Sequence, residues 1–178
     1  MALSSSAVQV AVTGAVSVAP IGSTAPTDAS TALDAAFKDL GYIGEDGVTE
    51  TRDRNSNDIT AWQNGALVRT VVTSGTLQFQ FTAIETNQRT IGAFYGATVT
   101  LAAAVIDAAV TGGQKMFVID VIDGAHLERI FIPQGEIIEV GEVTYSNGEA
   151  IGYPMTIQCY RNTTIGGNAK KFYQVLTT

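Results

Sequence analysis

Hydrophobic and polar residues alternate over much of this chain, which predicts a protein built mainly from β-strands. Valines recur at every second position between Val8 and Ala19, with an interruption at Gly14, so we expect a strand that is broken there. From Thr27 or Asp28 to Gly41, apolar residues recur instead at spacings of three and four. That spacing predicts a short helix, capped by the threonine or aspartate and ended by the glycine.

The clearest hairpin pattern is "VRTVVTSGTLQFQFTAI", from Val68 to Ile84. With Ser74 and Gly75 at the turn, three cross-strand pairs made mostly of apolar residues fall on one face. The other face then receives mostly polar residues. We therefore expect this segment to fold back on itself.

A second hairpin is predicted further along the chain. Lys115–Ile122 and Leu127–Ile132 can pair across a four-residue loop that contains Asp123 and a glycine. This register places Asp120 opposite Arg129, a favourable cross-strand ion pair. The proline that follows is expected to end the second strand.

A third hairpin is predicted from Glu136–Tyr145 and Ala150–Tyr160, which flank Asn147-Gly148. Asn-Gly is the strongest two-residue hairpin signal, because both residues tolerate positive φ. Lys171–Leu176 reads as a last short strand.

One further helix is predicted between these hairpins. Thr86 or Asn87 can cap a helix that runs to Tyr95, and Gly96 suits its C-terminal end. The following segment, Thr98–Ala109, reads as extended, although its alanines leave a helix possible.

A long polar arm, residues 45–62, stands out from the apolar pattern. From Glu50 to Asp58 it consists almost entirely of charged and polar residues, and it ends at Trp62, the single tryptophan. Such a segment buries too little apolar surface to order itself, so we expect a long loop that is mobile in the free protein.

The composition predicts a protein that associates with others. Hydrophobic residues make up 46% of the 178 residues and charged residues only 15%, where roughly a quarter is usual for a soluble domain. Part of the surface is therefore expected to be buried against other subunits. The net charge of −7 argues against binding nucleic acid, although it is compatible with a surface past which nucleic acid slides. We expect synthesis in the cytoplasm, because the first residues lack the pattern of a signal peptide and the most apolar run, Gly96–Gly113, contains Asp107.

No pattern in the sequence favours an enzyme, a cofactor or a metal site. The single histidine, His126, lies beside a predicted turn, and the single cysteine, Cys159, lies in an apolar row. Neither has a partner at the spacing that nucleophilic catalysis needs. The segment Asp53–Asp58 lacks the glycine and the closing glutamate of a calcium loop. Aromatic residues such as Trp62 and Phe94 are expected to be buried.

Four glutamates gather around the third predicted hairpin: Glu136, Glu139, Glu142 and Glu149. They can be a solvated strand edge that discourages unwanted pairing, or a wall of negative charge. The sequence leaves both interpretations open.

The segment from Gly41 to Gly96 contains "EDGVTE", the charged arm, "VRTVVT" and "IETN" in this order. In these motifs the chain resembles the major tail protein of long-tailed, non-contractile bacteriophages, particularly those that infect actinobacteria. The segments "YSNGEAIGYPMTIQCY" and "KFYQ" resemble the last third of that family. The resemblance implies a tail-tube-type β-sandwich or barrel with one flanking helix and a long inter-strand loop.

The same resemblance implies a structural role without catalytic residues or cofactors. Subunits would form hexameric rings that stack into a tube around the tape-measure protein, and genomic DNA would later pass through without specific binding. The tail terminator and distal tail proteins would be further partners, with no membrane contact. The subunit would be a virion tail component that assembles in the host cytoplasm.

The resemblance also suggests a role for each part of the chain. Residues 1–178 would form a single tail-tube domain, with an N-terminal arm (1–7), a stacking loop (45–62) and a flanking helix (86–95). The stacking loop, which is the polar arm of residues 45–62, would contact the neighbouring ring, with Trp62 as the apolar residue at its base. The residues expected at that contact are Glu50, Arg52, Asp53, Arg54, Asp58 and Trp62. The residues expected to face the lumen are Glu136, Glu139 and Glu142.

Two other functions remain open from the sequence. The first is a different structural protein of the virion, either a tail terminator or a capsid decoration protein. The second is a carbohydrate-binding β-sandwich, for which Trp62 and Tyr42 are the candidate aromatic platform.

Overall fold

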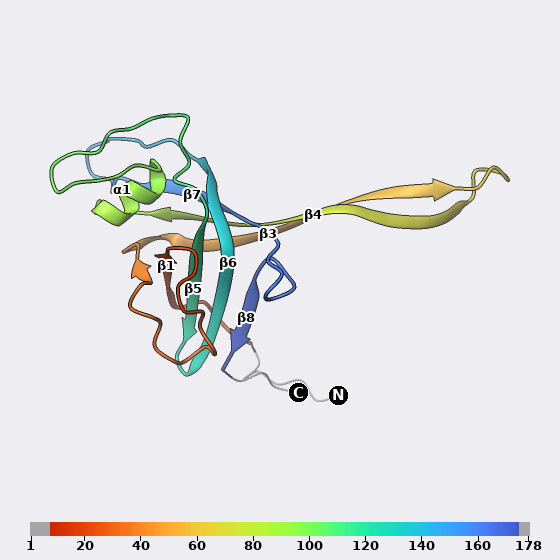
Figure 1. Cartoon of the computed structure of the whole chain (residues 1–178), viewed down its shortest axis with the longest axis horizontal. Coiled ribbons are helices and arrows are strands. Elements are labelled where there is room, and N and C mark those ends of the chain that lie inside the picture. Colours follow the sequence, from red (N-terminus) through yellow and green to blue (C-terminus); the bar gives the residue numbers. More distant parts are fainter. Residues whose placement is uncertain (1–7, 175–178) are drawn as a thin grey trace.

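The computed structural model describes residues 8–174, and the predicted N-terminal arm lies outside them. The fold is mainly β with one helix, as predicted: an antiparallel sheet has the order β2-β1-β5-β6-β7-β4-β3, and β8 pairs with β6 (Figure 1). The elements are β1 (Thr13–Ala19), β2 (Lys38–Asp39), β3 (Ile43–Thr60), β4 (Leu67–Ala83), α1 (Gln88–Phe94), β5 (Lys115–Asp123), β6 (His126–Val140), β7 (Tyr153–Cys159) and β8 (Lys170–Tyr173).

The long strand β6 joins two halves of the sheet. Its first part pairs with β5 and β8, and its second part pairs with β7. The main core lies between these halves and takes side chains from six elements (β1, β4, α1, β5, β6 and β7). Its fully buried members include Val16, Phe79, Phe117, Ile132 and Ile157. Burial of this alternate row of each strand explains why the period-two pattern predicted the strands.

A second apolar cluster lies on the opposite face of β5 and β6. Met116, Val118 and Phe131 pack there against Phe37, which belongs to the segment between β1 and β2. Residues 28–41 contain turns and the short strand β2 but no helix, so the helix predicted there is wrong, although its apolar residues such as Phe37 are used for packing.

The carboxylate of Asp28 caps a turn rather than a helix. It accepts hydrogen bonds from the backbone N–H groups of Ser30 and Thr31. The hydrogen bonds from Thr31, then the one from Ser30, hold the pKa of Asp28 well below its usual value. Local side-chain bonding of this kind competes with helix formation.

The predicted helix before Gly96 is present as α1. The side chain of Asn87 accepts hydrogen bonds from the backbone N–H groups of Arg89 and Thr90, and Gly96 follows the helix at φ 62°. The helix packs Phe94 edge-to-face against Tyr153 of β7.

The predicted fold-back at Ser74-Gly75 is wrong, because β4 runs straight through it. Instead the polar arm is itself a strand, β3, and pairs with β4 along a long hairpin. The turn lies at Asn64-Gly65, with φ of 59° and 64°. Both values are positive, as a type I′ turn requires. The Asn-Gly pair was the signal in the sequence that locates this turn.

The other two predicted hairpins are present with altered limits. Asp120 lies opposite Arg129 as predicted, but the connecting loop has two residues, since Asp123 pairs with His126. Pro133 lies within β6 and does not end it.

Two segments expected to be at least partly extended are mostly irregular. Beyond β6, residues 141–152 form a loop around Asn147-Gly148, and residues 97–114 form another with one isolated bridge, Val99 to Ala104. The last predicted strand is present as β8, and its predicted end at Leu176 lies outside the described residues.

Candidate assembly surfaces

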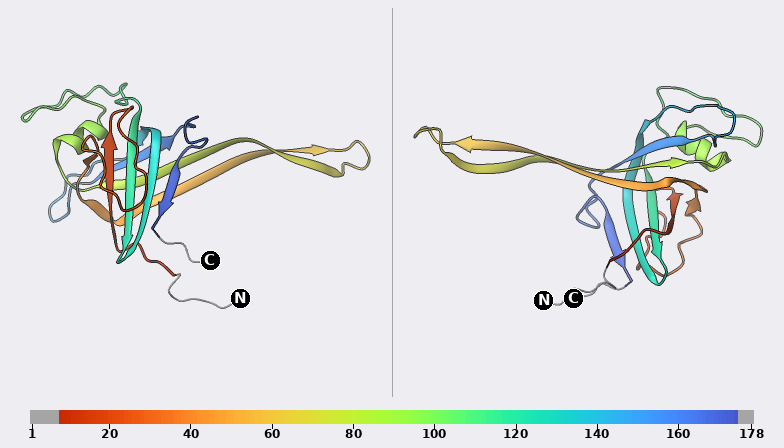
Figure 2. Two further views of the ribbon diagram at one scale, coloured as in Figure 1. Left: turned by 60° about the horizontal axis from the view of Figure 1, so that its bottom comes forward. Right: turned by 180° about the vertical axis from the view of Figure 1, so that it is seen from behind.

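The β3–β4 hairpin extends far beyond the body of the protein. Strand β4 pairs with β7 only from Gln78 to Ala83. Residues 52–77, which comprise the outer parts of β3 and β4 and the turn between them, therefore form a two-stranded ribbon that no third strand of the described chain pairs with. We call this segment the free ribbon. It projects to one side of the body in every view (Figure 2). Nearly all of its residues are exposed on both faces.

The outer end of the ribbon is apolar. We call residues 59–72 the hairpin tip. Its exposed apolar side chains are Ile59, Trp62, Leu67, Val68 and Val72. Trp62 is 98% exposed and stands at the turn, so the expectation that it is buried at the root of the arm is wrong. A tryptophan in this position is available for contact with another molecule.

The root of the ribbon is fastened to the body by an ion pair. Nζ of Lys171 on β8 lies 2.6 Å from Oε2 of Glu50 on β3 and 3.1 Å from Oε1 of Glu128 on β6. Burial alone would lower the pKa of Lys171, but the hydrogen bonds to Glu50 and Glu128 raise it overall. Glu50 therefore has a partner within its own chain.

The face of β6, β7, β4 and β3 that points away from the core is polar. We call this surface the polar face. Cross-strand pairing arranges it in two rows. One row is Glu136, Gln158, Gln78 and Thr51, and the other is Glu139, Thr156, Gln80 and Thr49. Neither row contains a lysine or an arginine, so the only charges that they carry are negative.

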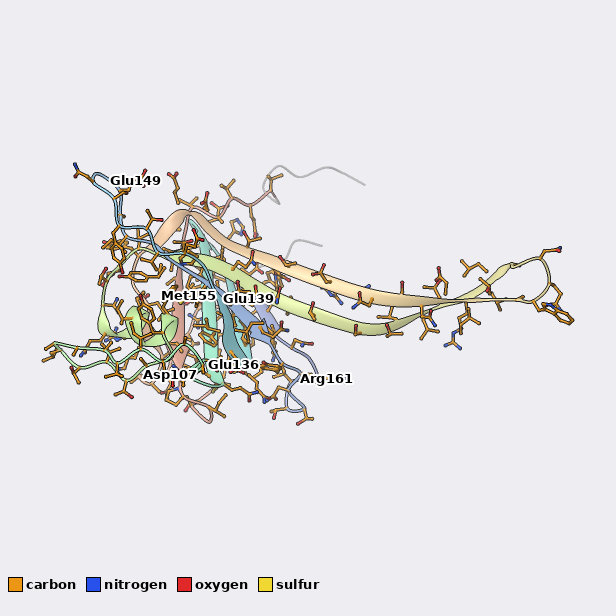
Figure 3. All side chains as sticks on the ribbon, turned by 90° about the horizontal axis from the view of Figure 1, so that it is seen from above. Asp107, Glu136, Glu139, Glu149, Met155 and Arg161 are labelled. Carbon is orange, nitrogen blue, oxygen red and sulfur yellow. The ribbon has the colours of Figure 1, made fainter. Side chains whose placement is uncertain are left out.

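The glutamates near the polar face differ in how they are held. Glu136 accepts hydrogen bonds from the hydroxyl groups of Tyr160 and Thr111, whereas Glu139 is exposed near the end of β6 (Figure 3). Glu142 and Glu149 lie in the exposed loop 141–152, off the sheet. Burial, then the contact with Glu136, raises the pKa of Tyr160.

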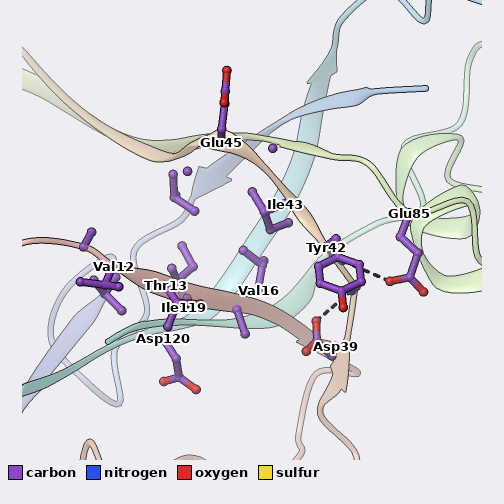
Figure 4. A pocket seen from close by; sticks show the side chains of 18 residues that line it. Val12, Thr13, Val16, Asp39, Tyr42, Ile43, Glu45, Glu85, Ile119 and Asp120 are labelled. Carbon is purple, nitrogen blue, oxygen red and sulfur yellow. Dashed lines mark hydrogen bonds between the residues drawn. The ribbon is translucent and has the colours of Figure 1, made fainter. Parts of the chain in front are cut away.

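An open groove of about 530 Å³ separates β1 from the start of β3, where the sheet does not close (Figure 4). Apolar side chains such as Val16 and Ile43 line it, and the carboxylates of Asp39, Glu45 and Glu85 border it. The groove thus lies between two strand edges that are largely unpaired.

A family model for phage tail tube proteins matches residues 1–174. The chain belongs to the phage tail tube protein family. It is a structural subunit of a virion tail. No curated protein matches this chain.

The solved structures that are similar to the chain include two of gene transfer agent particles. One is the tail of an empty gene transfer agent particle, refined with helical and C6 symmetry, at 10% identity and a TM-score of 0.46, covering 88% of this chain and 93% of that one. The other is the virion of a native gene transfer agent particle, at 10% identity and a TM-score of 0.42, covering 80% and 92%.

The residues weighed for chemistry in this tail tube subunit are not brought together. The thiol of Cys159 is buried in the core, and burial raises its pKa to about 12. His126 lies at the start of β6 opposite Asp123, whereas Cys159 lies opposite Gly135, further along β6. Among residues 8–174, no three His, Cys, Asp or Glu side chains gather closely enough to hold a metal ion. No helix in that range is long and apolar enough to cross a membrane.

The candidate aromatic platform for a carbohydrate is also absent. Tyr42 precedes β3 and Trp62 follows it, so the 18 residues of that strand separate them. At about 3.3 Å per residue this is roughly 60 Å. The two exposed rings cannot stack on one sugar.

Proposed function

We propose that this subunit forms hexameric rings that stack into the tail tube, with the free ribbon of each subunit reaching the neighbouring ring. The observation that supports this proposal is the ribbon itself. A two-stranded ribbon that leaves its domain has nothing to stabilise it but its own pairing, and such ribbons are marginal in water. Contact with a neighbouring subunit would supply the missing packing.

The reach of the ribbon suits a contact between rings. From Arg52 to Trp62 it extends by 11 residues, or roughly 35 Å in strand conformation. Arg52, Asp53 and Arg54 lie on this segment in alternating charge and are exposed. They are free to pair with groups of the neighbouring ring, whereas Glu50 is engaged by Lys171 at the root.

Within a ring, neighbouring subunits would meet at the strand edges on either side of the β1–β3 groove. An exposed edge invites pairing with another strand, and a closed barrel removes such edges. The low charged fraction of the chain fits a subunit that buries much of its surface in this way.

The polar face would line the lumen, with Glu139 as its exposed charge, Glu136 in the adjoining row and Glu142 beyond the end of β6. Carboxylates repel the phosphates of DNA, and the absence of lysine and arginine from both rows leaves nothing to hold them. Genomic DNA would pass without specific binding. The tape-measure, tail terminator and distal tail proteins would be the other partners, and assembly would take place in the host cytoplasm.

Excision of the free ribbon tests the proposal. Residues 55–74 are replaced by Asn-Gly, which joins the facing residues Arg54 and Gly75 by a two-residue turn. We expect the wild type to form hollow filaments at high concentration in electron micrographs and the variant to form at most single rings, with the same circular dichroism of the body. Filaments of normal length from the folded variant would overturn the stacking role. Single closed rings from the wild type would instead indicate a tail terminator.

A further inference from the structure

The loop of residues 97–114 is the second large apolar feature of the surface, and nothing in the described chain covers it. We call it the apolar loop. Leu101 is 96% exposed and Val105 is 84% exposed, and Ile106 and Val110 are exposed beside them. Loops longer than about 12–15 residues without secondary structure are uncommon in compact domains and are usually functional.

The apolar loop nevertheless has a defined shape. Its two ends cross where Gly96 contacts Gly112, and a Cβ on Gly96 would lie 2.5 Å from the backbone nitrogen of Gly112. Near the second end, the hydroxyl of Thr111 donates to Glu136 on β6. The backbone N–H of Thr100 donates to the carbonyl of Ala103 within the loop. The exposed aliphatic side chains therefore lie on a loop whose ends are held by the Gly96–Gly112 contact and by the hydrogen bond from Thr111 to Glu136.

The hairpin tip and the apolar loop lie at opposite ends of the long axis of the molecule (Figure 1). A contact between them within one chain is therefore excluded, but a copy displaced along that axis brings the tip of one subunit to the loop of the next. Such a contact joins two different surfaces, does not close on itself and propagates.

The charges of the two surfaces are complementary. Arg69 is the single charged residue of the tip, and Asp107 is the single charged residue of the apolar loop. Neither forms an ion pair within residues 8–174. A tip-to-tip contact would instead oppose two arginines.

The groove between β1 and β3 is a poorer receptor for the tip. It is bordered by the carboxylates of Asp39, Glu45 and Glu85. One arginine cannot neutralise three carboxylates, and burying the remaining negative charge without a cation is costly.

From these observations we propose that the hairpin tip of one subunit docks on the apolar loop of a second copy of this chain, with Arg69 paired to Asp107 across the contact. This inference rests on the proposed function and names the receptor that the free ribbon contacts. Trp62, Leu67 and Val68 pack on Leu101, Val105 and Ile106, and the ion pair fixes the register of the two apolar surfaces.

Charge reversal tests the pairing. Arg69→Glu and Asp107→Arg each place like charges at the contact, so each should raise the critical concentration for filament growth by roughly tenfold or more, because weak exposed contacts act together around each ring. A mixture of the two variants should restore growth, since every contact between unlike subunits is again of opposite charge. Arg161→Glu, on an exposed residue after β7, is the control and should grow like the wild type. Normal growth of both single variants, or no rescue in the mixture, would overturn the pairing.

Cross-linking separates this inference from the proposed function. Full-length Arg69→Cys and Asp107→Cys chains are mixed and treated with a short bismaleimide, because an arginine–aspartate ion pair spans more than a direct disulfide can. The native Cys159 is buried and does not compete. We expect the mixed cross-link in excess over both homodimers. Filaments without the mixed cross-link would overturn the docking contact and leave stacking intact. The mixed cross-link in the absence of filaments would keep the contact and overturn the tube, and the absence of both products would overturn both. If Glu45→Arg in the groove blocks growth while Asp107→Arg does not, the tip docks in the groove instead.

Discussion

Lys171 on β8 and Glu50 on β3 form an ion pair of 2.6 Å at the place where the long hairpin leaves the body. The same ammonium group also contacts Glu128 on β6. One lysine therefore connects the last strand of the described chain to the root of the ribbon, and we expect it to hold the direction in which the ribbon points.

Lys171→Met should lower the free energy of unfolding only slightly, by about 1 kcal/mol or less, because the pair is partly exposed to solvent. Its effect on the rate of filament growth should be larger than its effect on stability. Without the ion pair the root of the ribbon is held less firmly, so fewer encounters between subunits find the ribbon in the direction needed for docking. Urea unfolding and light scattering measure the two effects. Lys170→Met removes the same charge on the neighbouring residue and is the control. Equal growth rates for the two variants would contradict an orienting role.

The stability from Lys171 should be independent of pH until strongly alkaline conditions. Its pKa is raised in the folded protein, so its contribution is fully present below the pKa of an unfolded lysine, about 10.4, and is lost as the pH rises through the higher folded value. The difference in unfolding free energy between the wild type and Lys171→Met should therefore stay constant from about pH 7 to pH 9.5. It should shrink only above about pH 10.5. A difference that disappears by pH 9 would rule out this linkage.

Asp120→Ala, on the inner strand β5, should be strongly destabilising. Arg129, whose side chain is 8% exposed, donates from Nε and Nη2 to the carboxylate of Asp120 and from Nη1 to the backbone carbonyls of Asp28 and Thr31. Removal of the carboxylate leaves a buried cation without its counter-charge, at a cost of about 2–4 kcal/mol. Chemical denaturation measures this loss. The double variant Asp120→Ala, Arg129→Met should be less destabilised than Asp120→Ala alone, and the opposite order would contradict the explanation.

Gly65→Ala and Gly75→Ala should differ, although both lie in the hairpin. Gly65 has φ of 64° in the turn, where an alanine costs about 1 kcal/mol. Gly75 lies in the straight part of β4, and a Cβ there would meet only the carbonyl oxygen of Asp53, at an ordinary 3.5 Å. Hydrogen exchange should therefore accelerate in the outer ribbon of Gly65→Ala and remain unchanged in Gly75→Ala. Neither variant should change the unfolding of the body. Faster exchange in Gly75→Ala would contradict the placement of the turn at Asn64-Gly65.

Glu139→Lys should make assembled tubes retain DNA. The substitution adds a cation to a row of the polar face that has none, so we expect DNA to associate with the filaments at low salt and to be released as salt increases. Co-sedimentation with short duplex DNA measures the effect. Glu149→Lys, in the loop 141–152, makes the same charge change off the sheet and should not retain DNA. If the two variants bind DNA equally, the polar face does not line the lumen.

The sequence alone determined the features that depend on neighbouring residues. Asn87 starts α1 because its side chain satisfies the first backbone N–H groups of the helix. The period-two row of β7 predicted a strand because its apolar side chains are buried in the core. The pairing of Asp120 with Arg129 also followed from the sequence, since a short loop leaves few registers. The Asn64-Gly65 turn was available from the same kind of signal, although the alternation from Val68 to Ile84 fits two short strands as well as one long strand.

Tertiary structure decided which distant segments meet. The polar arm became β3 because β4 offers a complete row of backbone partners, and hydrogen bonding of this kind needs no apolar side chain. Trp62 became the exposed tip because the turn lies beside it, 18 strand residues away from Tyr42. Glu136, Gln158, Gln78 and Thr51 came to share one row of the polar face only when β6, β7, β4 and β3 paired. The opposite placement of Arg69 and Asp107 arises from the projection of the ribbon. These relations join residues far apart in the chain, so no local pattern encodes them.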